Sequence, residues 1–443
     1  MRLRVRWPWT LALLLCGSAW AQSAPLRLTM QEAIRLGLQA NLSVLVAEAR
    51  SGEAAGTVER RRSLLQPRVR IETPVALQNR SLAAMGIVVP HVSLPQVTGT
   101  YSTYDARTYA DQAIVDRQAL HALRSSRLSA SAAASDYQDA RDEVIRSVAG
   151  QYLAAQSQFA DAASAASRVD TAEALYKLAA DQRDAGVAMG IDVLRAQVQL
   201  ANEQQSLVQA RNRAQGSLLA LARMIGISPG TAIELADPLE YHAASAIAVD
   251  AVLPQALAAR PDYQSLIRQR GALSEQLDAS RARSLPRLLA SGNYGGIGRN
   301  PGSICSTGTI QVEVAFTVFD RDRQGEQAEI EARIRRIERQ LADARLGVEQ
   351  ELRQALLDLD SAAEEVRVAG VGLGLAEKEL DLARLRFSQG VTNNIEVISA
   401  QDALARAQQN RIIALTHHAD ARISMVRALG NTEGSYAEYL GSR

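Results

Sequence analysis

Apolar residues recur at helical spacing along the second half of this chain. Between residues 330 and 366, successive apolar positions are three or four residues apart, and ten steps cover 36 residues. This spacing matches the 3.6-residue period of a nearly straight α-helix, whereas a strict heptad would average 3.5 and supercoil. No proline follows Pro301, so nothing beyond it must break a helix. The stripe comprises Ile330, Ile334, Ile337, Leu341, Ala344, Val348, Leu352, Ala355, Leu359, Ala362 and Val366.

The pattern predicts one helix over residues 320–388, which would extend for roughly 100 Å at about 1.5 Å per residue. A lone helix of this length cannot bury its apolar stripe, so it needs equally long partners. An aromatic content of only 4% also favours long packed helices over several compact globules.

An internal repeat supplies these partners. Landmark residues of the first half recur in the same order in the second half, at two shifts. The shifts differ by 15, so the first half carries about 15 additional residues between Pro67 and Asp116. The matched pairs include Asn41 with Arg260 and Pro67 with Pro286 at a shift of 219, and Asp116 with Asp320, Gly186 with Gly390 and Gly226 with Gly430 at a shift of 204.

Each half is therefore predicted to contain a helix, an insertion, a very long helix, a glycine turn and another helix. Thr29 and Glu32 form a capping-box pattern at the first helix start. In the first repeat, residues 22–225, the elements cover 29–65, 66–115, 116–185 and 190–225. In the second repeat, residues 252–430, they cover 252–284, 285–319, 320–388 and 393–429. Residues 226–251 form a linker with proline turn signals, and residues 431–443 form a tail.

The insertions, with strands at about 67–115 and 286–319, show the period-2 alternation of β-strands. Within 308–319, one side is fully apolar over about ten residues, the length of a tilted membrane strand. A turn over 292–308 would join this strand to another over 288–294. In the first insertion, 69–77 would pair with a return strand whose tyrosines could sit at a membrane interface. The apolar side comprises Ile310, Val312, Val314, Phe316 and Val318, and the tyrosines are Tyr101, Tyr104 and Tyr109.

These hairpins fit a membrane, although a hairpin between a core and solvent has the same pattern. Four strands per chain cannot close a barrel, because single-chain outer-membrane barrels begin at about eight strands. Lipid does not tolerate open sheet edges. If the hairpins enter lipid, several copies of the chain must share one barrel.

The N-terminus has the features of a secretory signal peptide over residues 1–21. Three arginines start the chain, an apolar core follows at 11–16, and an Ala-Trp-Ala cleavage motif ends at Ala21. Lipidation of Cys16 is an alternative, disfavoured because Leu15 precedes it where small residues are usual. A cytoplasmic N-terminal strand or helix is the other alternative. After cleavage, Cys305 would remain as the only cysteine, without an intrachain disulfide.

Charge and residue chemistry argue against several function classes. A formal net charge of +1 provides no basic field for nucleic acid. Beyond the signal, no run of about 18 apolar residues predicts a transmembrane helix. Adjacent His417 and His418 would point about 100° apart on a helix, so they do not predict a metal site. The glycine-rich stretch 292–298 lies inside a predicted hairpin, which argues against a phosphate loop. With no nucleophile, base and orienting group, the sequence predicts neither an enzyme nor a cofactor.

Several short motifs stand in a defined order along the chain. They are Leu28-Thr29-Met30-Gln31-Glu32-Ala33-Ile34, Asn41, Gly186 to Asp192-Val193-Leu194 with Ala196-Gln197, Gly226-Ile227-Ser228-Pro229-Gly230, Leu235-Ala236-Asp237-Pro238, Leu257 to Arg260-Pro261-Asp262, Phe319-Asp320-Arg321 and Gln324-Gly325. Together with the double repeat, they resemble the TolC-like outer-membrane efflux channels, the outer-membrane factors of tripartite efflux and type I secretion systems. The resemblance covers nearly the whole mature chain, and its specificity comes from the order and spacing of individually weak motifs.

This resemblance implies a homotrimer of mainly α-helical chains with a small β part. Three chains would form a twelve-stranded β-barrel in the lipid of the outer membrane, on an α-helical barrel that crosses the periplasm. Residues 226–251 and 431–443 would belong to a mixed equatorial region. Substrate would move through the bore, driven by an inner-membrane pump that a periplasmic adaptor protein joins to the channel.

The resemblance also points to the glycine turns as periplasmic tips. Acidic residues that narrow this end in the family fall on Glu396 and Ser399, of which Ser399 departs from the acidic pattern. Copies of Glu396 would form an anionic constriction, with Asn393 and Asn394 beside it. A solvated glutamate in the first turn of a helix is the alternative. Contacts with the adaptor would fall on Arg183, Gly186, Met189, Asp192 and Gly390, and for Asp192 a plain helix start is the alternative.

We therefore predict a passive outer-membrane channel of an efflux or secretion system. The alternative is a soluble periplasmic or surface helical scaffold, whose hairpins bind a partner instead of lipid. Fractionation distinguishes the two, because a scaffold would be released by osmotic shock.

Overall fold

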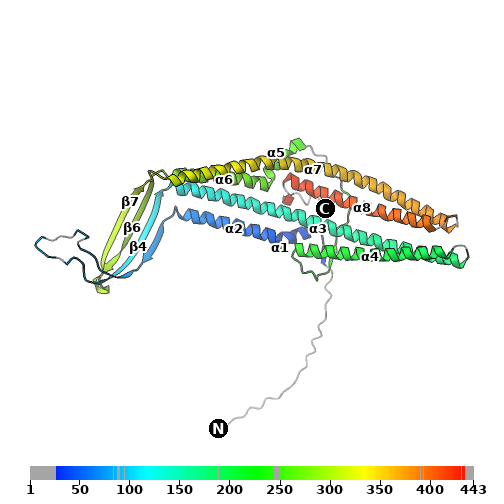
Figure 1. Cartoon of the computed structure of the whole chain (residues 1–443), viewed down its shortest axis with the longest axis horizontal. Helices are drawn as coiled ribbons and strands as arrows, with labels where there is room; N and C mark the ends of the chain where they lie inside the picture. Colours follow the sequence, from blue (N-terminus) through cyan, green and yellow to red (C-terminus); the bar gives the residue numbers. More distant parts are fainter. Residues whose placement is uncertain are drawn as a thin grey trace, which may run out of the picture.

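The computed structural model describes residues 26–82, 84–86, 90–93, 95–186, 189–243, 249–389, 391–392, 394–430 and 432–434. The predicted signal peptide with Cys16, and the turn residues Gly390 and Asn393, lie outside the described residues. Long helices run side by side along one axis, and a sheet extends from one end of them (Figure 1). The chain is mainly α-helical with a small β part, which confirms the predicted fold class.

The helices form two matching sets. Their two longest members, α3 and α7, have 68 residues each. Both begin at an aspartate: the side chain of Asp116 accepts a hydrogen bond from the Ala119 N–H at 2.8 Å, and that of Asp320 from the Arg323 N–H at 3.4 Å. The first set is α1 (Met30–Ala40), α2 (Leu42–Ser63), α3 (Arg117–Asp184) and α4 (Gly190–Met224). The second set is α5 (Val249–Ala259), α6 (Pro261–Ala282), α7 (Arg321–Ser388) and α8 (Asn394–Leu429).

The prediction of one continuous helix at the start of each repeat was wrong. Residues 29–65 form two helices that meet at Asn41, whose backbone is extended and whose side chain accepts from the Ser43 N–H at 3.0 Å. Residues 252–284 likewise form two helices that meet at Arg260. Asparagine is a preferred N-cap, and a proline disfavours the helical conformation of the residue before it. Asn41 and Arg260 are therefore the residues at which new helices start, at equivalent positions of the two repeats.

A glycine ends the last helix of each repeat and touches the helix junction of the same repeat. Gly226 follows α4 with φ +74°, and Gly430 follows α8 with φ +86°. A Cβ on Gly226 would lie 2.4 Å from the Cβ of Ala40, and one on Gly430 would lie 2.9 Å from the backbone nitrogen of Arg260. The positive φ and the close approach both favour glycine. The two repeats therefore share this tertiary contact as well as their sequence of elements.

A buried cluster lies midway along the helices. Strands β1 (Leu26–Leu28) and β5 (Ile233–Leu235) pair in parallel beside it. The fully buried Tyr152 of α3 donates its hydroxyl hydrogen bond to the carbonyl oxygen of Leu28 at 2.9 Å. Both repeats contribute to this core, which includes Met30, Ala33, Ile34, Val44, Val144, Ile145, Val148, Ala149, Tyr152, Leu153, Leu221, Ile225 and Ile423.

The strands of both insertions form one antiparallel sheet. Two short strands, β2 and β3, pair with the same long strand β4, and Thr73 and Pro74 separate them because proline cannot donate to a sheet ladder. β4 pairs with β6, and β6 pairs with β7. The bounds are β2 (Arg68–Glu72), β3 (Val75–Gln78), β4 (Tyr101–Val115), β6 (Arg287–Gly298) and β7 (Cys305–Ala315).

The predicted turn over 292–308 was wrong in its extent. β6 continues to Gly298 and β7 begins at Cys305, so the connection is short and contains a 3-10 helix, η1 (Pro301–Ser303). Strand β7 ends at Ala315, so Phe316 and Val318 lie beyond it.

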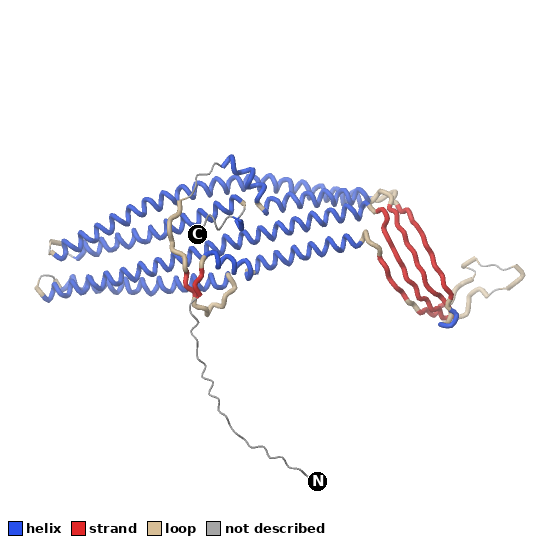
Figure 2. The backbone as a smooth tube through the Cα atoms, turned by 180° about the vertical axis from the view of Figure 1, so that it is seen from behind, coloured by secondary structure: helices blue, strands red, loops and turns tan. Residues whose placement is uncertain are grey.

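Helices and strands follow one lateral order. Near the sheet the helices pack in the order α2, α3, α6, α7, and in the other half in the order α4, α3, α8, α7. The main sheet order, β2, β4, β6, β7, matches because each of these strands is continuous in sequence with the corresponding helix. Figure 2 shows the sheet continuing the helical layer at one end. One edge of this layer is α2, β2 and α4, and the other is α7 and β7.

Candidate functional site

The strand pairing gives the sheet one apolar and one polar face. Side chains alternate along a strand, and directly paired residues share a face. The apolar face carries Val69, Ile71, Val75, Leu77, Tyr104, Ala106, Ala110, Leu288, Tyr294, Ile310, Val312 and Val314. The polar face carries Arg68, Arg70, Glu72, Gln78, Asp105, Arg107, Asp111, Ser291, Asn293, Thr307, Thr309, Gln311 and Glu313. Tyr101 and Tyr109 also lie on this face, with Leu289 and Ile297, so of the three tyrosines expected at a membrane interface only Tyr104 shares the apolar face. Ile310 is 90% exposed, so the chain leaves the apolar face uncovered.

Arg107 ties three strands together on the polar face. Its Nε lies 2.8 Å from an Asp105 carboxylate oxygen on β4, and its guanidinium donates to Asn293 of β6 at 2.9 Å and to Thr307 of β7 at 2.8 Å. The side chain is only 15% exposed. Sequence reasoning missed this cluster, although the alternation of charged residues through 105–111 was a signal of a polar face.

Both lateral edges of the layer are open. β7 has one ladder partner, and β2 and β3 pair only with β4 among the described strands. The edge helices carry exposed apolar residues at helical spacing. On α4 these are Leu194, Val198, Val208 and Leu219, and on α7 they are Leu346, Leu357, Val368, Leu375 and Leu382. Each edge is thus an apolar and hydrogen-bonding surface without a covering element in the described part of the chain.

The turn between α3 and α4 gathers four of the predicted adaptor-contact residues. Gly186 has φ +76°, and its N–H donates to the Arg183 carbonyl at 2.9 Å. Met189 is the N-cap of α4 and is 73% exposed. Asp192 follows in the first turn and pairs with Arg195 at 3.5 Å. This tip lies at the end opposite the sheet (Figure 1).

Glu396 lies in the first turn of α8 at the second tip. One carboxylate oxygen lies 2.9 Å from Arg386 of α7, and the other accepts a hydrogen bond from the Thr392 hydroxyl. Asn394 is the first residue of α8, and Ser399 is exposed. The structure therefore places Glu396 at the tip with a basic partner that the sequence reasoning did not include.

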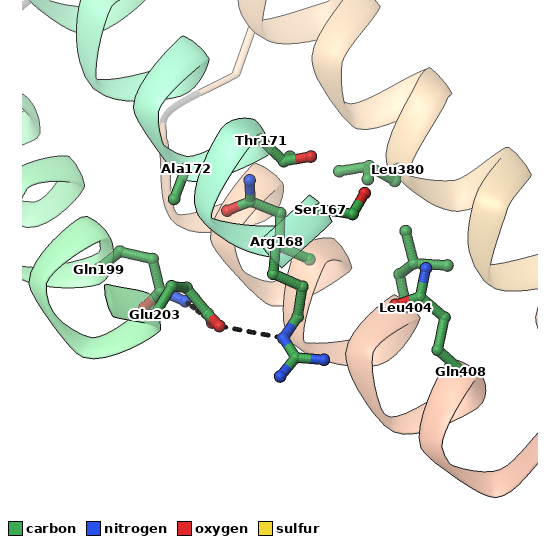
Figure 3. A pocket seen from close by; sticks show the side chains of 10 residues that line it. Ser167, Arg168, Thr171, Ala172, Gln199, Glu203, Leu380, Leu404 and Gln408 are labelled. Atoms are coloured by element: carbon green, nitrogen blue, oxygen red, sulfur yellow. Dashed lines mark hydrogen bonds and ion pairs between the residues drawn. The ribbon is translucent and has the colours of Figure 1, made fainter. Parts of the chain in front are cut away.

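The two hairpins contact each other behind their tips. Their apolar contact comprises Leu175, Leu380, Ala383, Phe387, Val397 and Ala400. A small polar cavity follows it, as Figure 3 shows. There Arg168 lies 3.0 Å from Glu203, which also accepts from Gln199 at 3.1 Å. Sequence reasoning missed this layer, because its polar residues belong to three different helices, α3, α4 and α8.

A cluster of charged side chains joins the repeats midway along the helices. Arg427 of α8 reaches Asp139 and Asp142 of α3, the latter at 3.9 Å. Burial raises the pKa of Asp142 to about 6, although the positive charge of Arg427 opposes this shift. The buried Arg260 pairs with Asp262 at 2.7 Å and also with Glu351.

The two adjacent histidines have different surroundings. His418 is buried against the Tyr241 ring, with centroids 4.6 Å apart, whereas His417 lies 3.2 Å from Glu365. Across the described ranges, no group of three or more His, Cys, Asp or Glu residues is arranged to hold a metal ion. Within the same ranges, no helix combines the length and apolar character of a membrane-spanning helix.

A family model described as outer membrane efflux protein matches residues 33–227 and 252–431. Curated relatives include Protein CyaE of Bordetella pertussis, 25% identical over 319 residues, which are 70% of this chain and 66% of the relative. The probable efflux pump outer membrane protein TtgC of Pseudomonas putida is 24% identical over 318 residues, 67% of this chain and 62% of the relative. The chain thus aligns with slightly less than two thirds of these relatives.

Solved structures share the fold. The outer-membrane channel OprN superposes with a TM-score of 0.74 at 18% identity, covering 90% of this chain and 89% of OprN. The outer membrane protein VceC from Vibrio cholerae superposes with a TM-score of 0.77 at 16% identity, covering 90% and 96%. The double-repeat layer with two open edges, and the family match over both repeats, show that this chain belongs to the outer membrane efflux protein family. It is a TolC-like protein of the outer membrane that extends into the periplasm.

Proposed function

We propose that this chain is the outer-membrane channel component of a tripartite efflux pump, a passive conduit from the periplasm to the exterior. The observation that carries the proposal is the two-faced sheet on a layer of long helices. Lipid accepts the uncovered apolar face, and an aqueous bore accepts the polar face with its Arg107 cluster. A soluble scaffold would instead leave residues such as Ile310 in water.

The open edges support a closed ring of identical chains. Strands β2 and β7 run in opposite directions, because they are the first and fourth members of an antiparallel series. A second copy can therefore place its β2 against β7 in antiparallel pairing, with its α4 against α7. Such a head-to-tail interface closes into a ring when its rotation permits. With β2 and β3 counted as one interrupted strand, each chain supplies four strands, and three copies would provide the twelve strands of the homotrimer that we propose.

The tips lie at the end opposite the strands, so we infer that they contact the periplasmic partner proteins. Arg183, Gly186, Met189 and Asp192 lie at the exposed α3–α4 turn, where a periplasmic adaptor protein would dock. The adaptor would link the channel to an inner-membrane pump. Glu396 and Ser399 at the second tip would line the periplasmic aperture, with Asn394 at the same turn.

Membrane fractionation and bilayer recording of the full-length protein test this proposal. We expect heat-modifiable trimers in the outer-membrane fraction and discrete conductance steps in planar bilayers. Charges on the apolar strand face, introduced by I310E together with V312E, should remove the protein from the membrane. A lipid-facing arginine or lysine costs about 2–4 kcal/mol near the midplane and a glutamate somewhat less, and the double variant places two such charges. Matched changes on the polar face, T309E and Q311E, should be tolerated. Monomeric protein released by osmotic shock would refute the channel.

The role of Glu396 has a separate test. If the Arg386–Glu396 pair holds the second tip closed, E396Q should raise single-channel conductance and weaken block by multivalent cations. E379Q, an exposed substitution on α7 away from this pair, is the control. Equal conductance and equal cation block in both variants would show that Glu396 is a solvated helix-start residue.

A further inference from the structure

A large concavity lies where the sheet meets the helices. It has a volume of about 810 Å³ and is lined by residues of α2, α3 and strands β2, β4, β6 and β7. Lining residues from the strands include Arg68, Asp111, Ser291 and Glu313, all on the polar face. If the polar face lines the bore, this concavity lies inside the channel, at the neck between its strand and helix portions.

Three arginines of this neck have no acidic partner within the described ranges. Arg61, Arg68 and Arg287 all line the cavity, and among the described residues none of them lies within ion-pair distance of a carboxylate. Arg61 and Arg68 are exposed, and Arg287 is half-buried.

The neighbouring acids are mostly committed elsewhere. Asp111 is bonded to Arg70, and Asp116 accepts from the Ala119 N–H at 2.8 Å as the N-cap of α3. Glu313 is the remaining acidic group of the lining, on the edge strand β7. The lining thus carries three arginines and three acids, and the contacts of Asp111 and Asp116 lie elsewhere, so the three arginines have no carboxylate partner within the described chain.

We propose that Arg61, Arg68 and Arg287 form an anion-binding ring in the neck of the channel, which recognises solutes bearing phosphate, sulfate or carboxylate groups. This inference rests on the proposed function, since a ring forms only when copies of the chain surround one bore. Guanidinium groups bind such oxyanions through paired N–H donors, and arginine rings are used in anion-conducting pores. Low-dielectric walls around a water-filled neck strengthen the field of guanidinium groups that have no acidic partner. The ring lies beside the sheet, at the opposite end of the long helices from the tip residue Glu396.

Block of the full-length channel by a polyanion tests the ring. Inositol hexakisphosphate is added to one side of the bilayer and then the other, and its half-blocking concentration is measured. We expect block from the strand side, where the neck is reached without passing the tip. The triple variant R61Q/R68Q/R287Q should raise the half-blocking concentration by roughly tenfold or more and shift the reversal potential in a KCl gradient towards cation preference.

A matched control lies on the same helix. Arg60 and Arg62 flank Arg61 but do not line the cavity, and Arg62 pairs with Glu59 at 3.5 Å. R60Q/R62Q should therefore leave polyanion block unchanged although it also removes arginines from α2. Equal block in the wild-type protein and the triple variant, or an equal loss in the control, would overturn the ring. Absence of conductance in the wild-type protein would instead refute the channel itself.

Discussion

Repeat one and repeat two interrupt their first helical stretch at equivalent residues with different chemistry. In repeat one, the neutral Asn41 caps α2 and donates to the Met224 carbonyl at 3.4 Å. In repeat two, Arg260 stands at that point, almost fully buried, and pairs with Asp262 and Glu351. In both, a left-handed glycine ends the last helix against the junction.

The two repeats share a backbone contact at the junction but differ in the side chain that stands there. In both repeats the end of the last helix packs closely against the junction of the first two helices, and this contact fixes their relative positions. The side chain at the junction differs, because each is surrounded by different elements. Substitutions at the shared contact should therefore cost more than substitutions at either junction side chain.

The largest effect is expected at the two glycines. G226A and G430A place a methyl group in a left-handed conformation and in overlap with Ala40 or with the Arg260 backbone, so each should destabilise the fold by about 2–4 kcal/mol. The unfolding midpoint, followed by far-ultraviolet circular dichroism, measures this. G216A is the control, because open space surrounds that helical glycine and alanine should stabilise by about 0.5–1 kcal/mol. An unshifted midpoint in G226A and G430A would contradict the shared contact.

The two junction side chains should differ in the next experiment. R260M leaves Asp262 and Glu351 without their buried cation, and we expect a loss of about 2–3 kcal/mol, reduced by the solvent exposure of both acids. N41A removes a helix cap and should cost about 1 kcal/mol. Equal midpoint shifts in the two variants would mean that the charged junction contributes no more than the neutral one.

Asp142 provides a pH-dependent test. Its repeat-two counterpart is the exposed Leu346, whereas Asp142 is buried with Asp139, Arg427 and Glu433 around it. Burial raises the pKa of Asp142 to about 6, from 3.8. The folded protein binds the Asp142 proton more tightly than the unfolded chain does, so protonation of Asp142 stabilises the fold. This stabilisation is complete below the unfolded pKa of 3.8 and is lost as pH rises through the folded pKa of about 6. D142N should therefore raise stability by about 1–2 kcal/mol near pH 8 and by little near pH 4. A midpoint difference independent of pH would contradict this.

The smallest effect concerns a hydrogen bond that repeat two lacks. Tyr152 donates to the Leu28 carbonyl, while its repeat-two counterpart is Leu356. Y152F leaves that carbonyl without this buried donor and should cost about 1 kcal/mol. Y176F, a change at a partly buried tyrosine packed behind the first tip, is the control and should leave the unfolding midpoint unchanged. Equal midpoint shifts in the two variants would count against the bond.

Much of the fold could be predicted because the local helix and strand signals of one repeat recur at equivalent positions of the other. Asp116 and Asp320 start the long helices, as expected from the repeat. The prediction failed where a glycine serves packing rather than a turn. Gly295 lies within β6, not in a turn. A Cβ there would be 2.1 Å from the Ala106 carbonyl oxygen of the adjacent strand, so the packing requires glycine at this position. The sequence offers the same residue for both purposes.

The candidate sites were predicted less completely than the fold. Glu396 was expected at the tip, but its partner Arg386 comes from another helix and was not foreseen. The positions of Arg61, Arg68 and Arg287 in the sequence do not suggest a common site. They line one concavity because α2, α3 and the sheet enclose it.

The order of amino acids was sufficient for the period of the helices, the double repeat and the alternating strands, because these depend on spacing along the chain. The fold decided which repeated residues are buried. α3 lies between helices on both sides, whereas α7 forms an edge, so equivalent positions such as Asp142 and Leu346 have opposite exposure. Burial and pairing depend on neighbours distant in sequence, and these neighbours are defined only when the repeats pack.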